Sequence, residues 1–311
     1  MNSKDKTEHT EKSIDVYELV TNRVIELLES NTVPWRKPWT DRGLPKNLIT
    51  KRPYRGINLM LLNSLDFEHS LFITFKQLKT IGGSVKKGEK GYFVVFTKML
   101  EEDVVKDGKT EKKKHSMLRY YKVFNISQCR DIPDAFIPKD LYENTEITDC
   151  TSVIDCMPNP PRIVHKKQEA FYVPSEDYIN IPKLKSFKEI GEYYGTLFHE
   201  LIHATGHQTR LNRKEVMENP TFGTEPYSLE ELVAEIGSCY LKSFTGLDIT
   251  DMSNNAAYIK GWLAVLKDDK RFILKASSKS QQAVEYILNT KAVEEPETEL
   301  VETEIPAVEV I

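Results

Sequence analysis

The sequence has few cysteines and no long apolar run, and both absences narrow the class of protein. Its four cysteines, spread over 311 residues, include no C-x-x-C pair, so we expect reduced thiols and neither a disulfide framework nor a zinc ribbon. No run approaches the roughly 20 apolar residues of a membrane helix. Residues 1–12 are polar and lack the apolar core of a secretory signal. We therefore expect a cytoplasmic protein with no membrane contact.

Basic residues outnumber acidic residues in the first half of the chain, and acidic residues outnumber basic residues in the second. From Lys12 to Arg130 there are 23 Lys and Arg against 13 Asp and Glu, whereas from Asp131 to Ile311 there are 18 against 31. The net charge of −4 therefore conceals a basic half joined to an acidic half. This asymmetry predicts two domains with different partners, the basic one facing a polyanion.

The first half is predicted to be a small α+β domain over 13–135. Apolar residues at helical spacing predict an amphipathic helix over 14–30. Further helices are expected at 57–65 and 74–81, and paired strands at 91–99 and 118–126. The charged segment 101–115 between these strands is predicted to be a mobile loop.

The second half is predicted to be a mainly helical domain over 145–291 with a small antiparallel sheet. Two short strands are expected within 169–182. The helices expected here are 145–156, 186–207, 228–244, 252–266 and 277–290. Residues 292–311 hold seven glutamates and no basic residue, so we expect this tail, like residues 1–12, to be disordered.

A metal-binding motif lies in the predicted helix 186–207. His199 and His203 belong to an H-E-x-x-H pattern, and positions i and i+4 share one face of a helix. Two imidazoles can then reach one zinc ion, while Glu200 takes a proton from zinc-bound water as general base. The alternative is an exposed helix with ordinary polar residues, because so short a pattern also arises by chance.

The third ligand must come from elsewhere in the chain. His207 is too far along the helix from His199, about 12 Å, to share one ion, and is better suited to a supporting role or a substrate contact. A metzincin would need histidine where Thr209 stands. The better candidates are Glu231 and Glu235, four residues apart on the next amphipathic helix.

Peptide hydrolysis is the default reaction of such a site. Candidates to stabilise the developing oxyanion are Tyr227, Tyr240 and His207. The strand within 177–182 is a candidate edge for pairing with an extended peptide, and nothing in the sequence identifies that peptide.

Aromatic and basic residues alternate in the first domain, as they do in proteins that bind single-stranded nucleic acid. Bases stack on aromatic faces while cations follow the phosphates. The candidate DNA-binding residues are Trp35, Arg36, Lys37, Trp39, Arg52, Tyr54, Arg55, Lys86, Lys87 and Lys90. The alternative is that the tryptophans fill the core and the lysines are merely solvated.

The two halves together resemble the ArdC-type antirestriction proteins of conjugative plasmids and mobile elements. The resemblance rests on "DVYELVTNRVIELLESNTVPWRKPW", "YRGINLMLL" and "FKQLKTIGGSVKKGEKGYFVVF", and on "YYGTLFHELIHATGHQTRLNR" and "YSLEELVAEIGSCYL". It implies an N-terminal domain that binds single-stranded DNA, a zincin-like C-terminal domain and protection of transferred DNA from restriction.

A second resemblance concerns the ligand helix. "LEELVAEIG" is similar to the second zinc helix of thermolysin-like gluzincins. It implies that Glu231 is the third ligand and that Glu235 holds a ligand histidine through its other ring nitrogen; the reverse assignment stays open.

The sequence leaves three functional hypotheses. The first is a DNA-binding antirestriction protein with a zinc metallopeptidase domain. The second is a non-enzymatic DNA-binding protein whose zinc site is structural or vestigial. The third is a metal-dependent amidase acting on something other than protein.

Overall fold

The computed structural model describes most of the chain in the interval from residue 15 to residue 290. The described ranges are 15–36, 44–65, 67, 69–106, 109–137, 150–218, 221, 224–247 and 256–290. The segments 1–12 and 292–311, which we predicted to be disordered, lie outside these ranges. Within the described part, no helix is both long and apolar enough to cross a bilayer.

The chain begins with α1 (Val16–Glu29), as its apolar spacing predicts. The Asp15 carboxylate caps its start by accepting the Tyr17 backbone N–H at 3.0 Å. Val20, Val24 and Leu28 are fully buried and form its inner face. Helix α2 (Gly56–Asn63) and helix α3 (Phe75–Thr80) follow, both close to the expected positions.

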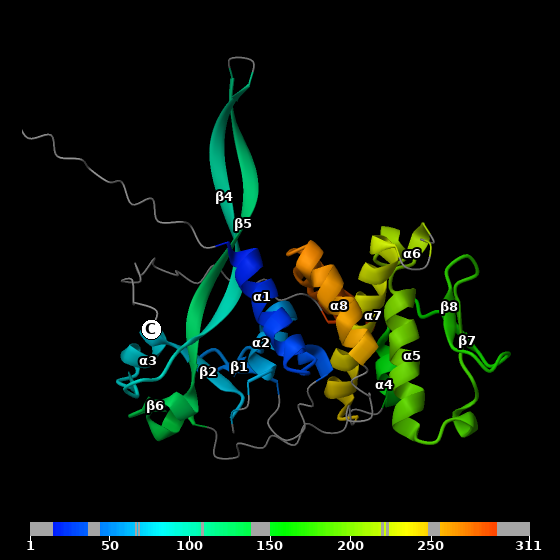
Figure 1. Cartoon of the computed structure of the whole chain (residues 1–311), viewed down its shortest axis with the longest axis horizontal. Coiled ribbons are helices and arrows are strands. Elements are labelled where there is room, and N and C mark those ends of the chain that lie inside the picture. Colours follow the sequence, from blue (N-terminus) through cyan, green and yellow to red (C-terminus); the bar gives the residue numbers. More distant parts are fainter. Residues whose placement is uncertain are drawn as a thin grey trace, which may run out of the picture.

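A four-stranded sheet forms the centre of this region, with strand order β1-β2-β5-β4. Strands β1 (Lys46–Asn47) and β2 (Leu71–Thr74) are short, whereas β4 (Tyr92–Lys106) and β5 (Lys109–Asn125) form a long hairpin. Its far half projects from the body of the molecule (Figure 1). A separate pair, β3 (Ser84–Val85) and β6 (Cys129–Arg130), lies beside this sheet.

The hairpin corrects our prediction of a mobile loop at 101–115. The backbone register continues from Glu101, which pairs with Lys114, to the turn. Lys112 on the facing strand donates to Glu101 Oε2 at 3.5 Å, and such cross-strand pairs of opposite charge contribute about 0.2–1 kcal/mol. A charged segment can therefore continue the two strands when an acid on one strand meets a base on the other.

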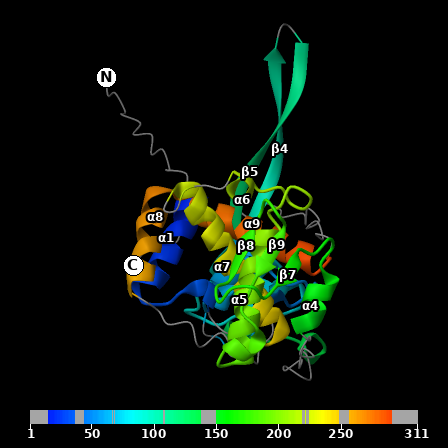
Figure 2. The same ribbon diagram turned by 90° about the vertical axis from the view of Figure 1, so that its right-hand side faces the viewer.

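The second region is mostly helical. Its main helices are α5 (Ile190–Ala204), α7 (Glu225–Thr245), α8 (Ala256–Asp268) and α9 (Phe272–Ile287), with short α4 (Cys150–Cys156) and α6 (Lys214–Met217). A three-stranded sheet of order β7-β9-β8 lies beside α5 (Figure 2). Strand β7 (Arg162–Val164) joins β9 (Tyr178–Asn180) in parallel, and β8 (Phe171–Val173) joins it antiparallel. The sheet is therefore mixed, whereas we predicted an antiparallel one. The difference arises because the sequence reading missed β7.

The two regions share one apolar core. Buried side chains of α1 and α2 belong to the same cluster as those of α5, α7 and α9. Polar contacts converge on Gly56 at the start of α2. Its N–H donates to Gln281 Oε1, and its carbonyl accepts the Tyr240 hydroxyl, both at 3.0 Å. Helices α7 and α9 are therefore packed directly against the N-terminal region.

Candidate metal centre and nucleic-acid surface

Helix α5 carries the first two residues of the candidate metal centre. Leu197, Leu201 and Ile202 are buried in the core, which turns His199 and His203 toward α7. The Nε2 atoms of these two histidines lie 3.1 Å apart. Two nitrogens bound to one zinc at about 2.05 Å with tetrahedral geometry would lie about 3.3 Å apart. The observed separation of the two nitrogens is thus close to that of two imidazoles bound to one zinc ion.

Glu231 on α7 supplies the third group. Its Oε2 lies 3.7 Å from His199 Nε2, and its Oε1 lies 3.7 Å from His203 Nε2. Each of the three residues offers one ligand atom, and these atoms all lie within 4.8 Å of one another. The two helices approach closely because Gly237 faces Ile202: a Cβ on Gly237 would lie 2.6 Å from Ile202 Cδ1.

Glu231 is held in the charged form that a metal requires. Burial favours its neutral form, but hydrogen bonding with His199 and the charge of His203 outweigh burial. The Tyr227 hydroxyl adds a further hydrogen bond. The pKa of Glu231 therefore lies below its ordinary value.

A buried ion-pair network holds the His203 ring at Nδ1, the nitrogen that faces away from the metal position. Glu230 Oε1 lies 3.1 Å from His203 Nδ1. Arg213 donates to both oxygens of the same carboxylate, with Nη2–Oε1 at 2.6 Å and Nε–Oε2 at 2.9 Å. It also donates to Thr205 Oγ1 at 2.6 Å and to the Ile202 carbonyl at 2.7 Å. With Nδ1 donating to Glu230, the His203 Nε2 lone pair is directed at the metal position.

This network revises the role we gave to Glu235. The carboxylate that orients His203 is Glu230, which the sequence reading passed over because the resemblance pointed four residues beyond Glu231. Burial raises the pKa of Glu230, but Arg213 and His203 lower it more, so the net shift is downward. The three-residue cluster contains neither Glu235 nor His207. His207 Nδ1 instead lies 2.9 Å from Thr209 Oγ1.

Glu200 lies beside the metal position without joining the cluster. Its side chain is buried, and burial raises its pKa although His203 and His199 partly oppose the shift. A carboxylate with a raised pKa is a stronger base than an exposed one and can hold a proton between transfers.

Of the three candidates to stabilise the oxyanion, Tyr227 is the one that contacts a residue of the His199–His203–Glu231 cluster. Its pKa is raised by burial, by the charge of Glu231 and its hydrogen bond, and by the charge of Glu200. Its hydroxyl is therefore hydrogen-bonded to the Glu231 carboxylate. The Tyr240 hydroxyl is instead bonded to Gly56 at the junction of the two regions, which is inconsistent with a catalytic role.

The strand edge next to the centre differs from our prediction. The strand within 177–182 is β9, which lies between β7 and β8 and so has no free edge. Strand β8 is an edge strand and contacts α5. Arg210 forms an ion pair with Asp177 at the β8–β9 turn, with an Nη2–Oδ1 distance of 2.6 Å. The Tyr172 hydroxyl donates to the same Oδ1 at 2.9 Å.

The candidate DNA-binding residues divide into four groups. Trp35 is 1 % exposed and Tyr54 7 % exposed, so their rings fill the core and cannot stack on bases. Arg55 forms an ion pair with Glu285 of α9. Arg52, Lys86, Lys87 and Lys90 are exposed. The Arg36 side chain, Lys37 and Trp39 lie outside the part that the structure describes.

Comparison with known proteins identifies both regions. Residues 14–124 match the N-terminal domain of the antirestriction factor ArdC, and residues 159–279 match a zincin-like metallopeptidase domain. The crystal structure of the antirestriction ArdC protein from plasmid R388, in its metal-free form, is 35 % identical. It superposes with a TM-score of 0.70 over 89 % of this chain and 100 % of that one. The chain belongs to the ArdC family.

Other similar proteins extend this placement. The Mn(II)-bound structure of the R388 ArdC protein has a TM-score of 0.69 at 33 % identity, covering 89 % of this chain and 98 % of that one. Protein y4eC of Sinorhizobium fredii (strain NBRC 101917 / NGR234) is 30 % identical over 88 % of this chain and 91 % of its own length. Two DNA primases TraC of Escherichia coli are each 31 % identical over 90 % and 88 % of this chain, which spans 20 % and 27 % of them.

The family placement confirms the two-domain α+β organisation predicted from the sequence. The donor set of the centre, two imidazoles and one carboxylate, could hold a divalent ion. The boundaries 13–135 and 145–291 stay predictions.

Proposed function

We propose that this ArdC-family protein binds single-stranded DNA and that its zincin-like domain is a zinc-dependent peptidase. The observation that carries the enzymatic part is the convergence of His199, His203 and Glu231 beside a buried Glu200. The protein would act against restriction of DNA transferred by a mobile element. Its peptide substrate would be bound by the zincin-like domain and its DNA by the basic one.

The residues present fit a zinc ion. Two imidazole nitrogens and one carboxylate are the protein ligands of many catalytic zinc sites, which keep another position open. The Arg213–Glu230 pair at His203 supplies the outer support that such ligands need. When bound, the ion would supply Lewis acidity.

The protein groups would perform the proton transfers. Glu200 would accept a proton from the attacking water on a carboxylate oxygen and then deliver it to the leaving amine. Burial raises the pKa of Glu200, which favours holding the proton between the two steps. The Tyr227 hydroxyl would donate to the substrate oxygen as negative charge develops there.

Metal analysis of matched variants tests the centre. We expect purified protein to retain about one zinc per chain, and we expect Glu231→Ala to lose it. Glu235→Ala is the matched control, because it removes the same group one turn further along α7. Equal metal content in both variants, or loss with Glu235→Ala alone, would contradict the assignment.

The DNA-binding part rests on the excess of basic residues and on the exposed cations Arg52, Lys86, Lys87 and Lys90. Binding to phosphates releases counterions, so the affinity should fall steeply as salt increases. Titration of labelled single and double strands at several salt concentrations tests this, and a preference for the duplex would contradict it.

A further inference from the structure

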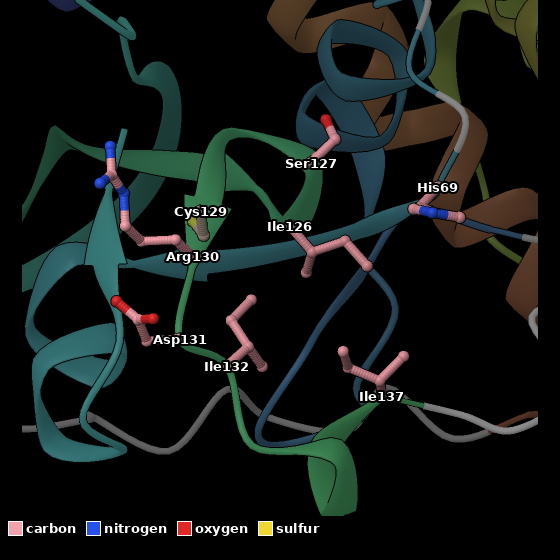
Figure 3. Close-up of a pocket in the computed structure, with 8 residues that line it drawn as sticks. All are labelled: His69, Ile126, Ser127, Cys129, Arg130, Asp131, Ile132 and Ile137. Atoms are coloured by element: carbon pink, nitrogen blue, oxygen red, sulfur yellow. The ribbon is translucent and has the colours of Figure 1, made fainter. Parts of the chain in front are cut away.

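A hollow in the N-terminal region lies at the meeting point of its exposed basic turns. It is open to solvent, has a volume of about 280 Å³ and is lined by His69 before β2 and by residues in and around β6. Figure 3 shows Ile126, Ile132 and Ile137 grouped around it, with His69 at one end and Arg130 and Asp131 at the other. It is remote from the residues of the metal centre, none of which line it.

The turn 86–90 is fixed to one side of the hollow. The Lys86 backbone N–H donates to the Gln128 carbonyl at 2.9 Å, and Lys86 Nζ donates to the Ser127 carbonyl at 2.7 Å. Gln128 Nε2 in turn donates to the Lys90 carbonyl at 3.0 Å. The exposed Lys86 side chain is thereby held beside Ser127, which lines the hollow, and the turn that carries Lys90 is held at Gln128.

A second basic turn is fixed to the opposite end of the same segment. Lys51 Nζ donates to the Phe136 carbonyl at 3.1 Å, next to Ile137 in the wall of the hollow. Exposed Arg52 follows Lys51. Arg130 lines the hollow, and Lys51 and Lys86 donate to backbone carbonyls of the segment 126–137 that borders it. Three separate stretches of chain therefore bring a cation to this recess.

We propose that this hollow receives one base of single-stranded DNA while the surrounding cations hold the adjacent phosphates. The inference rests on the proposed DNA-binding function and gives it a location. The isoleucines offer apolar contact to the faces of a base, and Asp131 offers an acceptor to its N–H groups. A volume of about 280 Å³, just below the roughly 300 Å³ of the smallest ligand pockets, is enough for one base.

This location explains how the protein binds DNA although Trp35 and Tyr54 are buried in the core. A base inserted between aliphatic side chains needs no aromatic platform, and an apolar recess among cations selects a ligand that is both anionic and partly apolar. A duplex keeps its bases stacked, so insertion of a base also favours single strands.

The test uses the whole protein and an end-labelled oligothymidylate measured by fluorescence anisotropy. Ser127 is exposed at the rim, so Ser127→Glu adds a negative charge there without disturbing the core. We expect it to weaken binding about tenfold or more, as loss of one base contact would. Ser186→Glu, an exposed serine in the zincin-like domain, is the matched control, and it should leave the affinity within about twofold of the original.

Arg130→Gln, with Lys188→Gln as its control, is the second pair. Loss of one phosphate contact should reduce the slope of log affinity against log salt by about one, and the control should leave it unchanged. Cross-linking with an oligonucleotide that contains 4-thiothymidine should label the segment 126–137.

The outcomes separate the two proposals. Failure of the unmodified protein to bind the oligonucleotide would overturn the DNA-binding function itself. Normal binding by the unmodified protein, with Ser127→Glu and Arg130→Gln indistinguishable from their controls, would overturn the hollow as the base site and leave DNA binding intact. Weakened binding in both rim variants, with cross-links at 126–137, would support it.

Discussion

The candidate metal centre and the basic surface of this protein are built in opposite ways. The metal centre joins two long helices whose inner faces are buried, and the Arg213–Glu230 pair behind it is itself buried. The basic surface consists of short turns whose lysines make single, exposed hydrogen bonds to backbone carbonyls beside an open hollow. The first site is held by buried packing, whereas the cations of the second are held by exposed individual contacts.

This difference predicts where substitutions will have sharp effects. A rigid site loses its function when one atom is replaced, because no neighbouring group can take over. A diffuse electrostatic surface loses affinity in small steps as charges are removed. The following experiments, from the largest effect to the smallest, can break or sharpen the contrast.

Glu200→Gln should lower peptide hydrolysis by about 10³-fold while leaving the metal content unchanged, because it removes the proton acceptor and no ligand. Turnover of a peptide library, beside metal analysis of the same preparation, measures both. Glu189→Gln, at the exposed start of α5, is the control. Antirestriction that survives Glu200→Gln would show that protection comes from binding and not from hydrolysis.

Trp35→Ala should destabilise the protein by about 3–5 kcal/mol, because it empties a large volume of the core. Urea unfolding measures the loss. Unchanged stability together with lost DNA binding would contradict the core role and restore the indole as a base contact.

Glu230→Gln should weaken metal binding about 10–100-fold, because the amide no longer pairs with Arg213 or fixes the His203 ring as firmly. Calorimetric titration of metal-free protein with Zn²⁺ and Mn²⁺ measures the affinity. Glu235→Gln on the same helix should retain it. An equal loss in both variants would point to a general effect on α7.

The Glu230 carboxylate should also make stability depend on pH. Because its folded pKa is below the ordinary value of 4.5, its contribution is fully present above that value and is lost as the pH falls through the folded pKa. The difference in unfolding free energy between metal-free wild type and Glu230→Gln should therefore shrink on acidification. A difference in unfolding free energy that stays constant from neutral pH to below about 4 would contradict this account.

Arg52→Gln should weaken DNA binding only a few-fold and reduce the salt slope by about one. Stability should change by less than about 0.5 kcal/mol, because the side chain is exposed. A loss of binding as complete as that of a missing metal ligand would mean that the basic surface is as rigid as the metal centre.

Sequence reasoning succeeded where local spacing sets the geometry. The H-E-x-x-H pattern places His199 and His203 on one face of any helix, and the next amphipathic helix carries Glu231 toward them. It was less successful for Glu230, because which of two adjacent glutamates faces His203 depends on how α7 is rotated against α5. It was least successful for the DNA-binding residues, because composition states how many cations and rings are present and not which of them are exposed.

The sequence by itself determined the two α+β domains, the helices of the zincin-like region and the pair of histidines with their neighbouring acid, because hydrophobic periodicity and the pitch of a helix are local properties. Only the tertiary structure decided that Arg213 holds Glu230, that Trp35 fills the core and that the charged segment 101–115 extends a hairpin. The first two depend on contacts between residues distant in the chain, whose free energy is set by packing and burial. The third depends on the register of two facing strands, which composition alone does not reveal.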